Sequence, residues 1–451
     1  MKKKSLLDDY LQKYSVGDQW ELIADHTDHI SQVVVIPAYA EKEMLFHTLA
    51  SLAENEPHVL EESLIICVVN NKADSPAAVI ENNSKTIKVL DALIKKKSSR
   101  DFEDEKYLIN LLNKISDSKM KLGCIDASSS GKALPLNTGG VGTARKIGMD
   151  TALRVLNKRS LSDGVILSLD ADTLVQSNYL PVVRDHFNPG VKTAILAYEH
   201  PLPENPGEQA AICCYEIFLR YWVLGLRYAK SPWAFHSIGS TIAVSADAYL
   251  AVRGMNKREA GEDFYFLSKL AKIGSIDYVK ETCVYPSTRV STRVPFGTGK
   301  RIERFLTGVA EDEYRLYDPQ IFSILADFLQ RITGVICQGE DEILLQAQLI
   351  HPGLKCFLES SDFPLAWSKI RRVAKEEKSL ARHFHVWFDA FRTLKMIHFL
   401  TKECYPPINM FAALKSLLDL SGISGLSLDT SDTIPPLAEQ INILNYMRTI
   451  T

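Results

Sequence analysis

Short apolar runs alternate with segments of helical spacing in the N-terminal half of the chain. Val33–Ile36 and Leu64–Val69 are rich in β-branched residues and bounded by polar ones, and Glu43–Ala53 between them carries apolar residues at helical spacing. Continuous short apolar runs are typical of strands buried on both faces of a parallel sheet. The pattern therefore predicts a β-α-β unit. Further strands are expected at Val165–Leu169, Thr193–Ala197 and Gly239–Val244.

Strand signals fade near Glu311, and helical periodicity continues from there to the C-terminus. The aromatic residues of this part recur at helical spacing, which favours packing against the preceding domain or against a second subunit. We therefore expect an α/β fold, with a mostly parallel sheet flanked by helices and a C-terminal α-helical domain. The expected divisions are a helical extension at 1–30, the sheet domain at 31–310 and the helical domain at 311–451. The charged segment Asn82–Lys119 is interpreted as an insertion at the edge of the sheet.

The composition and net charge of the chain indicate which classes of protein it can belong to. The chain has 451 residues, of which 46% are hydrophobic and 24% charged, as in an ordinary globular protein. Lys and Arg number 52 against 55 Asp and Glu, so the formal net charge is −3 and no basic field favours nucleic acid. Eight cysteines without a Cys-x-x-Cys pair predict reduced thiols. These features predict a cytoplasmic protein that does not bind nucleic acid.

Membrane contact is expected to be peripheral at most. No apolar run is long enough to span a bilayer, and Met1-Lys2-Lys3-Lys4 is not followed by the apolar stretch of a signal peptide. The aromatic segment Ile212–Tyr228, with Arg220 and Arg227, could instead lie on the inner face of a membrane. A buried helix is the favoured interpretation of that segment.

Polar residues follow the first two predicted strands, where ligands bind in open α/β sheets. The first strand runs into Pro37, Ala38, Tyr39 and Glu41, which offer a fixed turn, an aromatic ring that can stack on a base and a carboxylate that can accept hydroxyl protons. The second strand ends in Asn70-Asn71, whose amides can pair with both edges of a base or ribose. The alternatives are a plain β-to-α connection capped by Glu41 and an ordinary turn.

Asp170-Ala171-Asp172 places two carboxylates directly after the strand Val165–Leu169. Carboxylate oxygens are the ligands that Mg²⁺ and Mn²⁺ prefer, and such an ion also takes substrate phosphates. The alternative is a solvated turn that caps a helix. The motif therefore predicts either a divalent metal site or a capping turn.

Two helix starts carry further candidate residues. Gly139-Gly140-Val141-Gly142-Thr143-Ala144-Arg145 could let backbone N–H groups approach a phosphate, with Arg145 contacting a phosphate or a base. It is neither a Rossmann nor a Walker A motif. Glu262 and Asp263 stand at the start of a second helix, where the helix dipole stabilises them. A free carboxylate opposite a metal is also a natural general base, and Asp263 is our candidate.

In this order the motifs resemble those of GT-A fold glycosyltransferases, most closely family 2, over about residues 30 to 310. The resemblance implies transfer of a hexose from a UDP- or GDP-linked sugar, with the nucleoside held by Pro37, Ala38, Tyr39, Glu41, Asn70 and Asn71. It implies Mn²⁺ or Mg²⁺ on Asp172 and Asp170, bridging the diphosphate. It also implies inversion, with Asp263, beside Glu262, deprotonating the acceptor hydroxyl.

The chain departs from the family pattern at several points. Asn70-Asn71 stands where the family often has Asp, and the Gln-x-x-Arg-Trp motif of processive synthases is absent from the sequence. In that region lies a basic stretch with Arg289 and Arg293, interpreted as a diphosphate clamp or, alternatively, as a solvated loop. Trp233 and His236 could stack on an acceptor sugar or supply a metal ligand, although such residues are more often core.

Two other functions stay open at this point. A nucleotidyltransferase would share the sheet and the acidic metal site, but Pro37-Ala38-Tyr39 lacks the glycine-rich basic loop expected after its first strand. A non-catalytic nucleotide-sugar-binding protein would not require Asp170, Asp172 and Asp263. The sequence names no acceptor, and the C-terminal helices could form a homo-oligomer.

Overall fold

The computed structural model spans residues 1–451 and describes all of them except 1–5, 97–106, 159–163, 189, 291–296 and 427–432. The chain forms two compact units. The first, here called the sheet unit, comprises Met1–Pro201, Ser237–Ser287 and Arg293–Pro295. The second, the helical unit, comprises Leu202–His236, Thr288–Thr292 and Phe296–Thr451. This division differs from the domain boundaries expected from the sequence, because 202–236 belongs to the helical unit.

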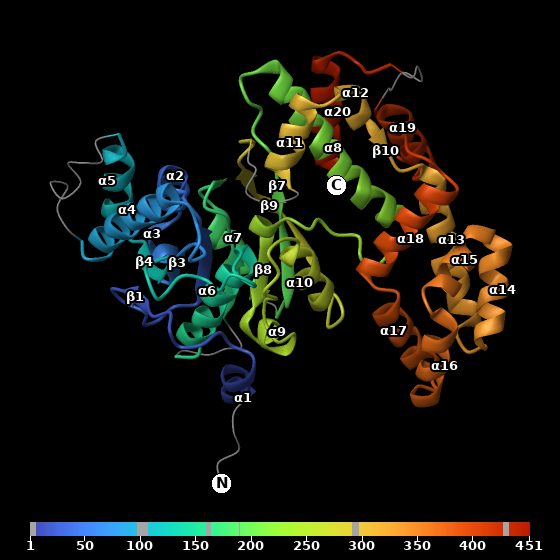
Figure 1. Ribbon diagram of the computed structural model, residues 1–451, viewed down its shortest axis with the longest axis horizontal. Coiled ribbons are helices and arrows are strands. Elements are labelled where there is room, and N and C mark those ends of the chain that lie inside the picture. The colour runs from blue at the N-terminus through green and yellow to red at the C-terminus, as the bar shows by residue number, and fades with distance from the viewer. Residues whose placement is uncertain (1–5, 97–106, 159–163, 189, 291–296, 427–432) are drawn as a thin grey trace, which may run out of the picture. The chain divides into compact units, whose positions relative to one another are not determined.

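The described part of the sheet unit contains a nine-stranded sheet in the order β1-β4-β3-β2-β5-β8-β7-β9-β6 (Figure 1). Strands β4, β3, β2 and β5 pair in parallel, as do β7 and β9, whereas β1, β8 and β6 run antiparallel to their neighbours. The strands are β1 (Leu22–Ala24), β2 (Gln32–Ala38), β3 (Ser63–Asn70), β4 (Lys121–Ala127), β5 (Val165–Ser168), β6 (Thr173–Val175), β7 (Thr193–Tyr198), β8 (Ile242–Ser245) and β9 (Asp277–Pro286).

Helices cover this sheet. They are α1 (Leu6–Lys13), α2 (Lys42–Leu52), α3 (Pro57–Glu61), α4 (Ala77–Ile94), α5 (Ile109–Asp117), α6 (Val141–Leu156), α7 (Tyr179–Phe187), α9 (Ala246–Ala251) and α10 (Glu262–Leu270). Every residue of β2 and β3 is buried, as their continuous apolar runs predict. Helix α6 packs on β2 and β3. The close approach needs Gly148, because a Cβ there would lie 3.0 Å from Val68 Cγ2 and still closer to Val35.

The α/β fold class expected from the sequence is confirmed, with local corrections. The predicted strand Gly239–Val244 opens as a 3₁₀ turn, Gly239–Thr241, before β8 begins. The N-terminal segment is not only helical, because β1 pairs with β4 at the edge of the sheet. Helices α4 and α5 occupy the segment read as an edge insertion, yet α4 packs against β3 and β4. Strand β4 went unpredicted because Gly123 and flanking polar residues interrupt its apolar run.

The helical unit is built around α8 (Pro206–Tyr228), which packs against α20, α11, α13 and α19. Its other elements are α11 (Thr298–Thr307), α12 (Ala310–Glu313), β10 (Arg315–Leu316), α13 (Pro319–Val335), α14 (Glu340–Ile350), α15 (Pro352–Ser360), α16 (Phe363–Val373), α17 (Glu377–Trp387), α18 (Ala390–Glu403), β11 (Ile408–Asn409), α19 (Met410–Leu420) and α20 (Leu437–Ile450). The aromatic residues of its C-terminal part form a core, in which Phe363 stacks on Trp367. C-terminal helices were therefore correctly predicted.

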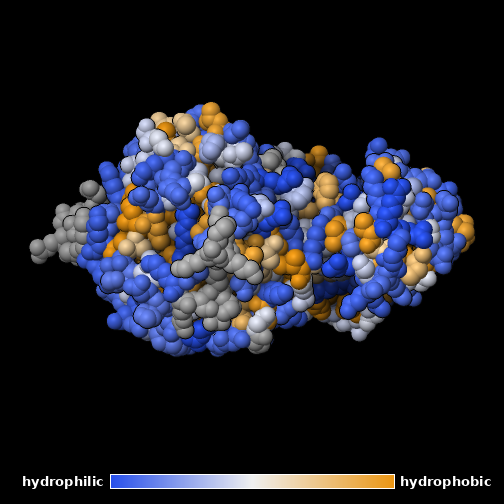
Figure 2. Space-filling model, turned by 90° about the horizontal axis from the view of Figure 1, so that it is seen from below, coloured by the Kyte–Doolittle hydropathy of each residue, from blue (hydrophilic) through white to orange (hydrophobic). Residues whose placement is uncertain are grey.

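Helix α8 is a buried helix, as favoured from the sequence. Glu216 and Arg220 are 0% and 1% exposed, and Glu216 binds both Arg220 and Arg448 through hydrogen bonds of 2.8 to 2.9 Å. Among the described residues, no helix is both long and apolar enough to cross a membrane. On the face shown in Figure 2, hydrophobic residues lie in small groups among hydrophilic ones.

Candidate active site

Arg145 joins two acidic segments that are far apart in the sequence. Its Nη2 donates to Asp170 Oδ1, 25 residues away, and its Nη1 donates to Glu262 Oε1, 117 residues away. Arg145 and Glu262 are each 3% exposed, whereas the Asp170 side chain is 34% exposed. Arg145, Asp170 and Glu262 thus meet after the end of β5, between α6 and α10, and Asp263 interacts electrostatically with Arg145 and Asp170.

Local backbone features make room for this bridge. A Cβ on Gly239 would lie 2.6 Å from Arg145 Cζ and closer still to Nη2, so the guanidinium fits only against a glycine. Gly261, just before α10, has φ +67°, in the left-handed region that favours glycine. Asn256 Nδ2 donates to Glu262 O at 2.8 Å and fixes the first residue of the helix. The bridge therefore depends on Gly239 beside the guanidinium and on Gly261 before the acidic helix start.

Burial and charge oppose each other in this cluster. Burial raises the pKa of Glu262 to about 7, although the Arg145 guanidinium acts to lower it. Burial also raises the pKa of Asp263 against the same guanidinium. Burial alone would lower the pKa of Arg145, but Asp170 and Glu262 raise it above its ordinary value, so Arg145 stays charged. One cation stands among three carboxyl groups, so a proton on Glu262 or a further cation nearby would reduce the repulsion between them.

The Asp170-Ala171-Asp172 turn is held by α2. Thr48 is fully buried, and its hydroxyl donates to Ala171 O at 2.9 Å. Strand β6, not a helix, follows the turn, so the helix-capping alternative for Asp172 is wrong. Thr48 was not identified from the sequence, because a threonine inside an apolar helix carries no sign of its partner.

The turn can hold a metal only if substrate and water supply part of the coordination shell. Asp170 and Asp172 are both half-buried, and the described residues contain no group of three or more His, Cys, Asp or Glu side chains arranged to hold a metal. Mg²⁺ is commonly held by one or two carboxylates and completed by phosphate oxygens and water. The two carboxylates fit that mode, in which substrate supplies part of the coordination shell.

The glycine-rich start of α6 packs against protein. A Cβ on Gly140 would lie 2.8 Å from Glu259 Cα, and one on Gly142 would lie 2.9 Å from Asn256 O. These two glycines therefore admit the segment that leads into α10. These contacts account for the glycines without any need for a bound phosphate. Arg145, which follows them in the sequence, binds carboxylates.

Asn83 of α4 joins the ends of β2 and β3. Its Oδ1 accepts from Ala40 N at 2.9 Å, and its Nδ2 donates to Asn70 O at 3.0 Å and to Asn71 Oδ1 at 2.8 Å. Asn83 is fully buried. Sequence reasoning missed this residue, although an asparagine within an otherwise helical pattern is a signal that could have drawn notice.

The two predicted amides at the end of β3 have different environments. Asn71 donates to Lys72 O at 2.9 Å, and its Oδ1 accepts from Asn83 and Ser128, so its side chain is used within the protein. Asn70 is 5% exposed, and its Oδ1 has no hydrogen-bond partner in the described part of the chain. Asn70 is therefore the better candidate for contact with a ligand.

The remaining residues at the first strand end lie together. Pro37 and Ala38 end β2 and are buried, whereas Tyr39 is half-buried. Glu41 is 6% exposed and precedes α2, but its side chain makes no capping hydrogen bond. The capping alternative for Glu41 is therefore excluded.

The other candidates lie in the helical unit or outside the described residues. Trp233 is 4% exposed, and its Nε1 donates to Phe388 O at 3.0 Å. Burial lowers the pKa of His236 to about 3, so its ring is neutral, and Nε2 lies 3.3 Å from Thr451 O. These contacts favour the core interpretation for both residues. Arg289 is exposed, and Arg293 lies outside the described residues.

The basic stretch beyond Arg293 is largely neutralised by its own neighbours. Lys300 Nζ lies 2.7 Å from Glu303, and Arg304 Nη2 donates to Glu313 at 2.6 Å. Arg301 lies 3.5 Å from the same Glu313 carboxylate. These pairs, within α11 and between α11 and α12, favour a structural role for Lys300 and Arg301, the last residues of the predicted basic stretch.

Comparisons with known proteins give distant structural likenesses. No protein-family model and no curated protein matches the chain. The structure of S. aureus TarS 1-349 in complex with UDP-GlcNAc is 12% identical, with a TM-score of 0.35 over 73% of this chain and 91% of that one. The mannosyltransferase PcManGT from Pyrobaculum calidifontis, in complex with GDP-Man and Mn²⁺, is 14% identical, with a TM-score of 0.34 over 86% of this chain and 92% of that one. At such scores neither likeness assigns an activity.

Proposed function

We propose that the chain is a glycosyltransferase that moves a sugar, of the hexose type, from a nucleotide-diphosphate donor to an acceptor hydroxyl. The observation that supports this most is the meeting of Arg145, Asp170, Glu262 and Asp263 at the carboxyl end of the sheet. Ligands of open α/β sheets bind at that edge. The order of motifs that resembles family 2 of the GT-A glycosyltransferases supports the same reaction.

The donor diphosphate would lie at the Asp170-Ala171-Asp172 turn. Asp172, with Asp170, would hold Mn²⁺ or Mg²⁺, and the bound ion would stabilise negative charge on the departing nucleoside diphosphate. Thr48 fixes the backbone of the turn through Ala171 O. Arg145 keeps Asp170 in place, so its role is to position the acidic groups rather than to contact a phosphate.

The nucleoside would lie where β2 and β3 end. Tyr39 offers a half-buried ring for stacking, and Asn70 offers a buried oxygen without a partner for an N–H of the base. Asn83 holds both strand ends by three hydrogen bonds. Pro37, Ala38 and Glu41 complete this edge.

Asp263 would act as the general base. Its carboxylate would take the proton of the acceptor hydroxyl while that oxygen attacks the anomeric carbon, and the nucleoside diphosphate would leave from the opposite face with inversion. Burial raises the pKa of Asp263, which makes its carboxylate a stronger proton acceptor than an exposed one. Glu262, bound to Arg145, holds the start of α10 in place.

Thermal unfolding with nucleotide sugars tests this function. Wild-type protein should be stabilised by UDP-GlcNAc or GDP-Man, used here as first probes, in the presence of Mn²⁺, because a ligand that binds only the folded state raises the melting temperature. Asp172→Ala should lose the Mn²⁺-dependent part of the shift. Asp247→Asn, which alters an exposed carboxylate on α9, should behave like wild type.

The outcomes separate the proposed function from its alternatives. Release of nucleoside diphosphate together with the shift supports transfer, whereas a shift without turnover of any donor supports a non-catalytic binding protein. Stabilisation by nucleoside triphosphate rather than by nucleotide sugars would favour a nucleotidyltransferase. If no nucleotide sugar produces a shift, the proposed function is wrong.

A further inference from the structure

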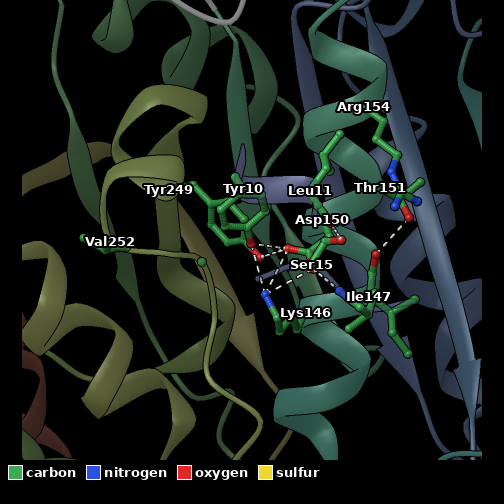
Figure 3. A network of polar contacts seen from close by, with 12 residues as sticks. Tyr10, Leu11, Ser15, Lys146, Ile147, Asp150, Thr151, Arg154, Tyr249 and Val252 are labelled. Carbon is green, nitrogen blue, oxygen red and sulfur yellow. Dashed lines mark hydrogen bonds and ion pairs between the residues drawn. The ribbon is translucent and has the colours of Figure 1, made fainter. Parts of the chain in front are cut away.

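Asp150 of α6 lies at the centre of a buried polar network (Figure 3). It is fully buried, and three side chains converge on its carboxylate. Tyr10 of α1 and Tyr249 of α9 donate their hydroxyls to Oδ1 at 2.6 and 2.7 Å, and Lys146 Nζ lies 3.1 Å from Oδ2. The network therefore joins α1, α6 and α9 through one carboxylate.

Both tyrosines of this network are protonated. Burial and the Asp150 charge both raise the pKa of Tyr10 and of Tyr249, so each keeps its proton and acts as a donor. Lys146 Nζ also donates to Tyr10 Oη at 3.0 Å. The backbone N–H of Val16 donates to Asp150 Oδ2 at 2.9 Å and ties the chain after α1 to the same carboxylate.

Tyr10 also determines where the segment after α9 can lie. Gly254 has φ +70°, and a Cβ there would overlap the Tyr10 hydroxyl and lie 3.0 Å from Tyr249 Oη. The backbone of Gly254 therefore rests directly on the two tyrosine hydroxyls. Helix α1 contributes one wall of the space that this segment occupies.

The same segment is fastened to α10. Lys269 Nζ donates to Gly254 O at 2.6 Å and to Val252 O at 3.1 Å. Asn256, two residues after Gly254, donates to Glu262 O at 2.8 Å. Phe266 of α10 packs edge to face on Tyr249, with ring centroids 5.8 Å apart. A displacement of Gly254 would thus be transmitted to the start of α10, which carries Glu262 and Asp263.

We propose that Tyr10 of the N-terminal helix is a positioning residue for Glu262 and Asp263, acting through Gly254 and Lys269; the catalytic consequence rests on the proposed function of that pair. Tyr10 touches neither carboxylate. Its hydroxyl donates to Asp150 and lies against Gly254, and Lys269 of α10 donates to Gly254 O. Helix α1 is then part of the support of the active site.

Tyr10→Phe is the sharpest variant, because it removes one oxygen and keeps the ring. Tyr179→Phe is the matched control: Tyr179 is fully buried on α7 in the same unit, and its hydroxyl has no partner in the described part of the chain. Amide hydrogen exchange over 252–263 reports the placement of the segment. Donor hydrolysis, with kcat and KM measured separately, reports its catalytic consequence.

In Tyr10→Phe we expect amide exchange over 252–263 to be about tenfold faster, with the rest of the sheet little changed. Donor hydrolysis should show a kcat about tenfold lower and an unchanged KM for the donor, because the nucleotide edge is untouched. Tyr179→Phe should match wild type in both measurements. Gly254→Ala, which pushes a methyl group onto the Tyr10 hydroxyl, should raise exchange in the same segment.

Exchange that rises evenly through the sheet unit, or exchange that is unchanged over 252–263, would overturn the proposal. An unchanged kcat in a destabilised Tyr10→Phe protein would do the same, because it would show a purely structural role. If wild-type protein neither binds nor hydrolyses any donor, the proposed function fails. The exchange comparison then still decides whether Tyr10 sets the placement of Glu262 and Asp263.

Discussion

Replacement of Arg145 by Met should expose how strongly the acidic cluster depends on one cation. The substitution keeps most of the side-chain volume and removes the charge between Asp170 and Glu262. The side chains of Arg145 and Glu262 are 4% and 5% exposed, so little water can replace the lost guanidinium. Breaking a buried ion pair by removing one partner costs about 3–5 kcal/mol.

Two features lower that figure for this site. The Asp170 side chain is 34% exposed, so solvent screens its interaction with Arg145. Glu262 has a pKa of about 7 because of its burial, so it can take up a proton once the guanidinium is gone. We therefore expect Arg145→Met to destabilise the sheet unit by about 2–4 kcal/mol at pH 7.5.

The double variant Arg145→Met/Glu262→Gln measures the coupling free energy between Arg145 and Glu262. Glu262→Gln leaves a neutral amide, so the second substitution should restore about 1–3 kcal/mol in the Arg145→Met background. Cys67 and Cys124 lie on β3 and β4 of the sheet unit and are 0% and 2% exposed. Their rates of alkylation in increasing urea therefore report the unfolding of this unit alone. If the two single effects add within about 0.5 kcal/mol, the inferred coupling does not exist.

Three further predictions follow from the same geometry. Glu262 has a folded pKa of about 7 against an ordinary value of 4.5, so its contribution to stability is fully present below pH 4.5 and is lost as the pH rises through 7. Relative to Glu262→Gln, wild type should therefore lose up to about 3 kcal/mol of stability over that pH window, measured by cysteine alkylation. If the stabilities of the two proteins change in parallel with pH, this prediction is contradicted. Asn83→Ala should lower the free energy of urea unfolding by about 2–4 kcal/mol, because it leaves buried backbone groups unpaired. Asn82→Ala, which loses one hydrogen bond of 3.2 Å, should lower it by less than about 1 kcal/mol. Equal losses in the two variants would refute the assigned role of Asn83. Gly239→Ala should displace the Arg145 guanidinium and lower donor turnover about tenfold, while Gly190→Ala, at an open position with φ +86°, should affect stability only.

Much of the sheet could be predicted because its signals are local. Val33–Ile36 and Leu64–Val69 are continuous apolar runs, and each became a buried strand. Strand β4 has no such run, because Gly123 interrupts it, and its position depends on pairing with β3 and β1. The 3₁₀ turn at Gly239 was likewise not predictable, since the sequence does not show that the Arg145 guanidinium packs against this residue.

The candidate site was only partly predictable, for a related reason. Residue types identified Arg145, Asp170, Glu262 and Asp263, but they could not show that Arg145 faces two carboxylates from segments 25 and 117 residues away. Asn83 and Thr48 act through hydrogen bonds to distant backbone groups, and the sequence does not show which groups these are. The glycines at the start of α6 have a visible pattern, yet their role depends on the loop at Asn256–Glu259 that packs on them.

Donor hydrolysis by wild type and Asp263→Asn, measured as release of nucleoside diphosphate with Mn²⁺ present, tests the central claim most directly. Wild-type protein should turn over at least one nucleotide sugar. Asp263→Asn should keep the thermal shift produced by that donor and lose turnover by about 100-fold or more, because an amide cannot accept the proton of the attacking water. Unimpaired turnover by Asp263→Asn would contradict the account.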